Sequence, residues 1–242
     1  ESKQFTDQEN GHFFIRQSFT LSNINVLNKL EDDLLILSNG LNAEFFLSDI
    51  QSSMNTIMLV SKFDHCLNDI LYRVRNNSLN LNIKAIVSNH KIAEEIANFS
   101  KIPFYYFPVD KSNKEKQELK IKNLIIKNDV EMIVLARYMQ VLSKEFTNEF
   151  EGKIINIHHS FLPSFKGAKP YHQAFERGVK VIGATAHYVT SDLDEGPIIE
   201  QDTQVVDHEM MPNNLVSMGR DIESRVLYRA LKAHSERRVF LN

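Results

Sequence analysis

The sequence predicts an α/β fold in which a small α+β module precedes a doubly wound, mainly parallel sheet. Two observations predict it. Five short, almost wholly apolar runs lie between residues 55 and 159, and helical segments separate most of them. A parallel sheet gives such runs because helices cover both of its faces. Residues 12–19, by contrast, alternate apolar and polar positions, as in a half-buried strand.

The composition indicates a soluble globular protein. Of the 242 residues, 43% are hydrophobic, which is enough for a substantial core. The net charge of −3 provides no basic surface for nucleic acid or an anionic membrane. No apolar run reaches the ~20 residues that cross a bilayer. The single cysteine, Cys66, indicates a reducing compartment. We therefore expect a cytoplasmic protein whose partners include neither nucleic acid nor membrane.

The first module is expected within residues 1–50. Residues 12–19, HFFIRQSF, alternate apolar and polar positions and predict a strand. Residues 23–37 have helical spacing, and residues 42–50, NAEFFLSDI, predict another strand. The second domain is expected to comprise residues 51–242.

The apolar runs of the second domain predict the strands of its sheet. They are residues 55–61, 81–89, 103–109, 130–136 and 153–159, and the helices between them are expected over 64–75, 90–99 and 114–127.

Two further runs and a helix follow. Residues 181–190 and 196–206 predict an antiparallel pair at the edge of the sheet. Pro212 is favourable in the first turn of a helix. The long helix expected after it has one apolar stripe, formed by Leu215, Met218, Ile222, Val226 and Ala230.

The segment NIHHSF contains the first candidates for chemistry. Ligands of α/β sheets bind beyond the carboxyl ends of the strands, where Asn156, His158 and His159 are expected. Alternation along a strand places Asn156 and His158 on one side, and His159 on the other unless the chain turns there. An amide that binds an oxyanion and an imidazole that moves a proton suit acyl chemistry. The alternative is a polar network that holds a loop to the sheet.

The second candidate is TSDLDEGP, residues 190–197, which contains Asp192 and Asp194 and has the composition of an ordinary turn. A carboxylate there could instead orient an imidazole or activate water. A metal site is the rival use of these groups, but no signature such as H-E-x-x-H is present. Its candidate ligands are His158, His159, His172, His187 and Asp194. No phosphate loop exists, which argues against nucleotide binding.

The paired motifs INIHHSFLPSFKGA and GATAHYVTSDLDEGPII resemble those of the formyltransferase superfamily that uses 10-formyltetrahydrofolate. The family has N-I-H-x-S-x-L-P and, downstream, a His followed seven residues later by an Asp. LARYMQVLS, residues 135–143, is similar to the family's folate-binding segment, and the likeness spans roughly residues 54–240. The resemblance implies catalytic roles for Asn156, His158 and Asp194, and a supporting role for His187.

Within the superfamily, the chain resembles the formyltetrahydrofolate deformylases. SKFDHC replaces the Gly-rich turn that cradles a phosphate in the glycinamide ribonucleotide transferases, and His159 replaces their usual Pro. The resemblance implies hydrolysis of 10-formyltetrahydrofolate to formate and tetrahydrofolate, which supplies formate to purine biosynthesis and balances the one-carbon pool. The alternatives are formyl transfer to an amine acceptor, or a non-catalytic sensor of folate or amino acids.

The same resemblance assigns further roles. Asn156 would stabilise the oxyanion, and Asp194 with His158 would position or deprotonate water. His187 and His159 would support these groups, although a structural role for His159 is an equal alternative. The folate would contact Met139, Gln140, Val141, Leu142, Thr190 and Asp192, with core filling as the alternative for the apolar side chains. No metal and no cofactor besides the folate substrate is expected.

Such deformylases have an ACT-type βαββαβ domain before the catalytic domain. Residues 1–50 would be a partial domain of this type that lacks the initial strand and helix, so we expect the sequence to be truncated at its start. By analogy with ACT modules, we also expect a homo-oligomer and a possible amino-acid effector.

Overall fold

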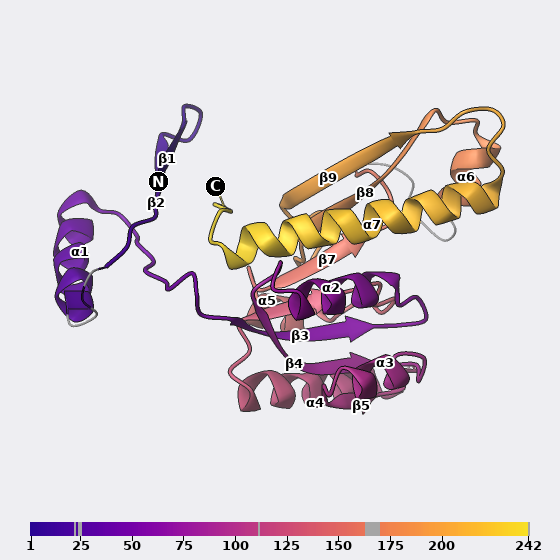
Figure 1. The fold of residues 1–242 in the computed structure, drawn as a ribbon, viewed down its shortest axis with the longest axis horizontal. Coiled ribbons are helices and arrows are strands. Elements are labelled where there is room, and N and C mark those ends of the chain that lie inside the picture. The colour runs from indigo at the N-terminus through magenta and orange to yellow at the C-terminus, as the bar shows by residue number, and fades with distance from the viewer. Residues whose placement is uncertain (22, 24–25, 111, 163–169, 242) are drawn as a thin grey trace. The chain divides into compact units, whose positions relative to one another are not determined.

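The computed structural model describes residues 1–21, 23, 26–110, 112–162 and 170–241. The chain divides into two compact units (Figure 1). The first consists of Glu1–Ser52 together with the chain end from Phe240, and the second of Ser53–Val239. Among the described residues, no helix is long and apolar enough to span a membrane.

The first unit contains a hairpin and a helix. Strand β1 (Ser2–Asp7) pairs antiparallel with β2 (His12–Gln17), and α1 spans Leu27–Leu41. The strand expected over residues 12–19 is confirmed, whereas the helix begins and ends four residues later than expected. The ACT-type assignment stays a prediction.

The strand expected over residues 42–50 is wrong, since the structure assigns no strand to residues 43–49. Phe45, Phe46 and Leu47 are consecutive, so the run lacks a strict alternation. Phe46 is 69% exposed, and no buried face of this segment exists that would favour a sheet.

The second unit is built on a seven-stranded sheet with the order β5-β4-β3-β6-β7-β8-β9. The first five strands in this order are parallel, and β7, β8 and β9 are joined by antiparallel pairing. The strands are β3 (Met54–Val60), β4 (Leu81–Ser88), β5 (Phe104–Tyr106), β6 (Met132–Leu135), β7 (Ile154–His158), β8 (Val181–Tyr188) and β9 (Ile198–Val205). The mainly parallel sheet and its antiparallel edge pair are confirmed.

The order of the strands has one consequence for function. The chain proceeds outward from β3 through β4 to β5, and then returns to the other side of β3 with β6 and β7. The direction of winding therefore reverses between β3 and β6. In open α/β sheets, ligands bind at this reversal, beyond the carboxyl ends of the strands.

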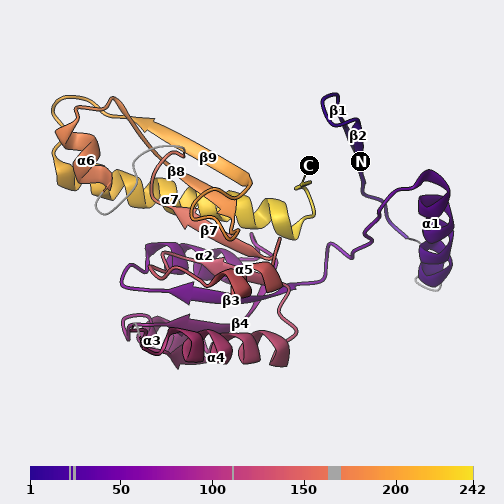
Figure 2. The ribbon, with the colours of Figure 1, turned by 180° about the vertical axis from the view of Figure 1, so that it is seen from behind.

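Helices cover both faces of the sheet (Figures 1 and 2). Alternate strand residues point to opposite faces, so Met58 and Ile155 pack in a core with α2 and α7, whereas Ile57 and Ile154 pack in a core with α4 and α5. The helices are α2 (His65–Arg75), α3 (Glu94–Phe99), α4 (Lys114–Lys127), α5 (Lys144–Glu149), α6 (Pro170–Glu176) and α7 (Pro212–Ser235).

Helix α7 begins at the expected proline, and its predicted apolar stripe is confirmed. Leu215, Ile222, Val226 and Ala230 are fully buried, and Met218 is partly buried. A charged residue, Glu223, lies inside the same buried surface with a side-chain exposure of 1%. A buried carboxylate requires hydrogen-bond or ion-pair partners, and the partners of Glu223 lie near the carboxyl ends of the strands.

Candidate active site

The site lies where β7 ends. Asn156 is half-buried and His158 is buried, and both alternate with Ile155 and Ile157, whose side chains enter the α7-side core. Pairing with β8 places Asn156 opposite His187 and His158 opposite Thr185. The alternation expected from sequence thus brings the amide and the imidazole to one side of the strand.

Asp194 comes to this side from the turn after β8. The turn ends at Gly196, where a Cβ would lie 1.8 Å from the backbone oxygen of Tyr188, so no larger residue fits. Asp194 has a left-handed backbone with φ of 58°, which Asp tolerates better than most residues. Its Oδ1 lies 3.2 Å from Nδ1 of His158 and 3.8 Å from Nε2 of His187.

Burial and hydrogen bonding together determine the protonation state and the tautomer of His187. Burial lowers the pKa of His187, so the ring is neutral near pH 7. Nδ1 lies 2.8 Å from the carbonyl oxygen of Tyr188 and must donate to it, which leaves Nε2 as an acceptor. Nδ2 of Asn156, at 3.2 Å, donates to that Nε2. His187 therefore orients the amide of Asn156.

The carboxylate of Asp194 is ionised near neutral pH. The hydrogen bond from His158 is the main cause that lowers the pKa of Asp194, and it outweighs the opposing effect of partial burial. Nε2 of His158, on the far side of the ring, is buried and has no hydrogen-bond partner among the described residues. A buried imidazole nitrogen without a partner is a place where a ligand or water is expected.

His159 contacts the Asp194–His158 pair through the ring of His158. Strand β7 ends at His158, and His159 lies in the bend that follows. The two imidazole rings stack with centroids 5.1 Å apart and an angle of 29°. Burial, together with the charge of Arg137, lowers the pKa of His159 to about 4, so this ring is neutral.

The expected folate segment, residues 139–142, is held at both ends. The backbone N–H of Met139 donates to Ser61 Oγ at 2.9 Å. Beyond the segment, the N–H and Oγ of Ser143 both donate to the buried carboxylate of Glu118, at 2.9 and 2.5 Å. Between these anchors Met139 and Val141 are more than half exposed, so core filling does not explain them.

The other residues predicted to contact the folate are Gln140, Leu142, Thr190 and Asp192. Gln140 and Leu142 are half-buried, and Leu142 packs against the α4-side core. Thr190 and Asp192 lie in the turn that contains Asp194, where Thr190 Oγ1 donates to the backbone oxygen of Asp192 at 3.2 Å. No contact of these four residues with the Asp194–His158 pair follows from these distances, and their role stays a prediction.

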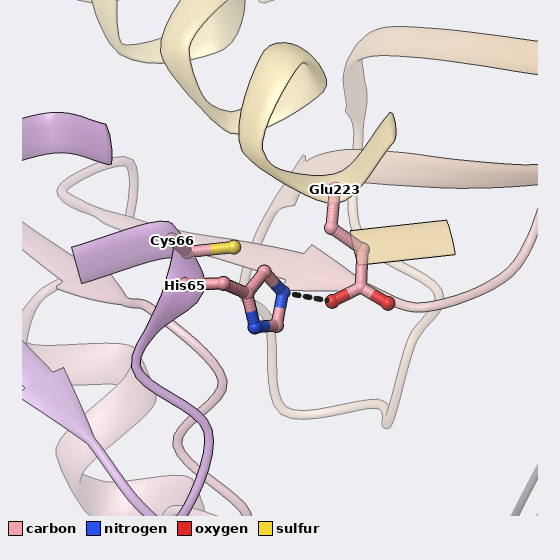
Figure 3. Close-up of side chains that lie close together, drawn as sticks. All are labelled: His65, Cys66 and Glu223. Atoms are coloured by element: carbon pink, nitrogen blue, oxygen red, sulfur yellow. Dashed lines mark hydrogen bonds and ion pairs between the residues drawn. The ribbon is translucent and has the colours of Figure 1, made fainter. Parts of the chain in front are cut away.

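A second polar cluster includes Glu223 of α7 and His65 of α2 (Figure 3), and sequence reasoning did not single it out. Glu223 Oε2 lies 2.7 Å from Nε2 of His65 and 3.3 Å from Nε of Arg137, and Tyr171 donates to Oε1 at 2.8 Å. Burial raises the pKa of Glu223, but His65 and Arg137 outweigh it and lower the pKa overall. The signal available for Glu223 was its place directly after Ile222 of the apolar stripe, and Arg137 lies within LARYMQVLS, the segment similar to the family's folate-binding segment.

The structure brings only some of the candidate metal ligands together. His158 and His187 lie near Asp194, whereas His172 belongs to α6. The described residues also place His65, Cys66 and Glu223 with ligand atoms within 4.8 Å of one another. Burial raises the pKa of the Cys66 thiol well above its usual value, and both oxygens of Glu223 accept hydrogen bonds. A protonated thiol and a paired carboxylate suit a hydrogen-bonded cluster better than a cation site.

Comparison with known proteins identifies the family of this chain. Residues 54–231 match the family model described as formyl transferase. A protein of Corynebacterium sp. (strain P-1), named formyltetrahydrofolate deformylase, is 44% identical over 100% of this chain and 85% of its own length.

Solved structures give the same result. The crystal structure of a formyltetrahydrofolate deformylase from Pseudomonas putida KT2440 is 48% identical with a TM-score of 0.95, covering 100% of this chain and 86% of that one. A phosphoribosylglycinamide formyltransferase from Anaplasma phagocytophilum is 29% identical with a TM-score of 0.72, covering 78% and 90%. Sequence and fold together place this chain in the formyltetrahydrofolate deformylase family, within the formyl transferases.

Proposed function

We propose that the protein hydrolyses 10-formyltetrahydrofolate to formate and tetrahydrofolate. The observation that carries the proposal is the contact of ionised Asp194 with His158, beside an amide that His187 orients, at the carboxyl edge of the sheet. Relatives named formyltetrahydrofolate deformylase, similar over the whole chain, support the same reaction.

The reaction needs a donor for the oxyanion that forms when water attacks the formyl carbon. Asn156 has two N–H bonds on Nδ2, and one of them is engaged by His187. The second is available for the oxyanion. Because the hydrogen bond to His187 fixes the amide, the donor needs no reorganisation during the reaction, and one such donor typically contributes about 10²–10³ in turnover.

The reaction also needs groups that move protons. Asp194 is ionised and accepts a proton from the attacking water, while its hydrogen bond fixes the ring of His158. The unpartnered Nε2 of His158 then serves the leaving nitrogen or the oxyanion. This scheme requires no metal and no cofactor besides the substrate.

The substrate would bind along Met139–Leu142 and the turn with Thr190 and Asp192. The two anchored ends of the first segment and its exposed side chains support this placement. We further propose a cytoplasmic enzyme that supplies formate to purine biosynthesis. We also propose that the protein forms a homo-oligomer and that an amino-acid effector binds to residues 1–50.

The decisive experiment gives the purified protein 10-formyltetrahydrofolate and water, with and without glycinamide ribonucleotide. Hydrolysis predicts release of formate at the same rate in both cases. Formyl transfer that depends on the amine would replace the hydrolase with a transferase, and folate binding without turnover would identify a sensor. Activity that survives exhaustive chelation would remove the metal alternative.

A further inference from the structure

Arg137 lies beside the catalytic pair in the sheet. Strands β6 and β7 pair in parallel with Leu135 next to Asn156, and continuing this register brings Arg137 level with His158. On its other side, Arg137 accepts a backbone hydrogen bond from Ser61, which follows β3. Arg137 therefore occupies the reversal between β3 and β6, the place where ligands bind in such sheets.

The guanidinium of Arg137 is buried and incompletely bonded. The residue is 9% exposed; Nη1 has no hydrogen-bond acceptor among the described residues, and Nε makes an ion-pair contact with Glu223 at 3.3 Å that lacks the geometry of a hydrogen bond. Such unpartnered buried atoms occur in only three other described residues, and two of these, His158 and Ser160, adjoin His159. Buried donors without acceptors are costly, so their gathering at one place points to a ligand.

Neighbouring side chains hold Arg137 in an unfavourable backbone conformation. Its backbone is left-handed, with φ of 64°, which is unfavourable for a residue with a side chain. Nε is paired with Glu223 at 3.3 Å, and Glu223 is itself fixed by His65 and Tyr171. Strain that the surroundings maintain is characteristic of functional sites.

The local charge favours an anion. The Cζ atoms of Arg137 and of the exposed Arg220 each lie 5.5 Å from the centre of the Phe63 ring, and the carboxylate of Glu223 pairs with Arg137. His159, between this cluster and Asp194, is neutral because its pKa is about 4.

We propose that Arg137 binds the small carboxylate product, formate, through the unpaired N–H groups of Nη1, and that Glu223 is its positioning residue. This inference rests on the proposed function. The water oxygen bonds to the formyl carbon and the C–N bond breaks. The carbon leaves as formate with its hydrogen, its own oxygen and the water oxygen. One water proton goes to the leaving nitrogen and the other to solvent. A charge-assisted hydrogen bond to the resulting carboxylate occupies the donors that the free protein leaves unused.

Formate binding tests the proposal directly. Calorimetry with sodium formate is compared between the wild type, Arg137→Gln and Arg137→Lys. Loss of the guanidinium should weaken binding by about tenfold or more, which corresponds to about 1.4 kcal/mol. The lysine variant, which keeps the charge without the planar group, should lie between the two. Glu223→Gln should also weaken formate binding, since it releases the guanidinium.

Product inhibition provides the second readout, with tetrahydrofolate release measured while formate is added. The inhibition constant for formate should rise in Arg137→Gln and stay unchanged in Arg229→Gln, a surface arginine of the same helix as Glu223 that pairs with Asp202. Unchanged formate binding in folded Arg137→Gln, or no formate binding by the wild type, would overturn the proposal. Should Arg137→Gln not fold, Arg137→Lys decides by the same criterion. Calorimetry needs no turnover, so a failure of the proposed hydrolysis is distinguished from a failure of this site.

Discussion

Replacing Asp194 with Asn separates a catalytic role from a structural one. The substitution keeps the shape of the side chain, and an amide oxygen can still accept from Nδ1 of His158 across 3.2 Å. It removes the negative charge, and with it the acceptor for a water proton. The proposed mechanism therefore loses proton transfer, while the turn keeps its hydrogen bond.

The two effects differ in size. Loss of a positioned proton acceptor typically lowers turnover by about 10²–10⁴-fold. This corresponds to about 2.7–5.4 kcal/mol of transition-state stabilisation at about 1.36 kcal/mol per factor of ten. The side chain of Asp194 is 24% exposed, and the ion pair of such a partly exposed carboxylate contributes only about 1 kcal/mol or less to stability. Activity should fall far more than stability.

The assay measures formate release under single-turnover and steady-state conditions, together with urea unfolding and tetrahydrofolate binding. Asp207→Asn, in an exposed turn, is the matched control and should behave as the wild type. A turnover of Asp194→Asn within about tenfold of the wild type would refute the assignment of Asp194 as proton acceptor.

Three further substitutions follow from the same structure. Gly196→Ala should lower turnover by about 10²-fold, because the new Cβ collides with the Tyr188 oxygen at 1.8 Å and displaces the turn that carries the catalytic carboxylate. Tyr171→Phe should lower the free energy of unfolding by about 1–3 kcal/mol, since buried Glu223 loses a hydrogen bond of 2.8 Å. Burial lowers the pKa of His234 from 6.5 to about 4, so the unfolded chain binds its proton first and stability falls as the pH drops from 6.5 towards 4. His234→Gln should flatten this dependence.

Each of these predictions has its own control. Thr203→Ala, at an exposed position of β9 away from the turn, is the control for Gly196→Ala in the formate assay. Normal turnover of Gly196→Ala would contradict the close approach of residue 196 to the Tyr188 oxygen. Tyr72→Phe, at a tyrosine that is 55% exposed, should leave urea unfolding unchanged. An equally steep pH dependence in His234→Gln would assign acid sensitivity to other groups.

Much of the fold could be predicted because burial acts on the chain locally. The run VEMIVLA becomes β6 because the sheet buries it on both faces, and the segment after Pro212 becomes α7 because its period gathers the buried residues on one face. Residues 42–50 failed because their apolar side chains are not buried: Phe45, Phe46 and Ile50 stay exposed, so burial does not favour a strand there. Pairing of β7 with β8 in the antiparallel sense depends on chain direction, which local periodicity does not contain.

For the site, the sequence by itself determined the residue types and their parity. Asn156 and His158 share one side of a strand because side chains alternate, and the spacing of the paired motifs added Asp194. Only the tertiary structure decided that His187 orients Asn156, and that Glu223 and Arg137 meet behind His159. These contacts join β7 to β8 and the segment after β6 to α7 across long stretches of chain, and such contacts depend on the packing that brings their two atoms within about 3 Å. A buried glutamate and an arginine leave no periodic trace in a sequence, so their partnership appears only when the chain is folded.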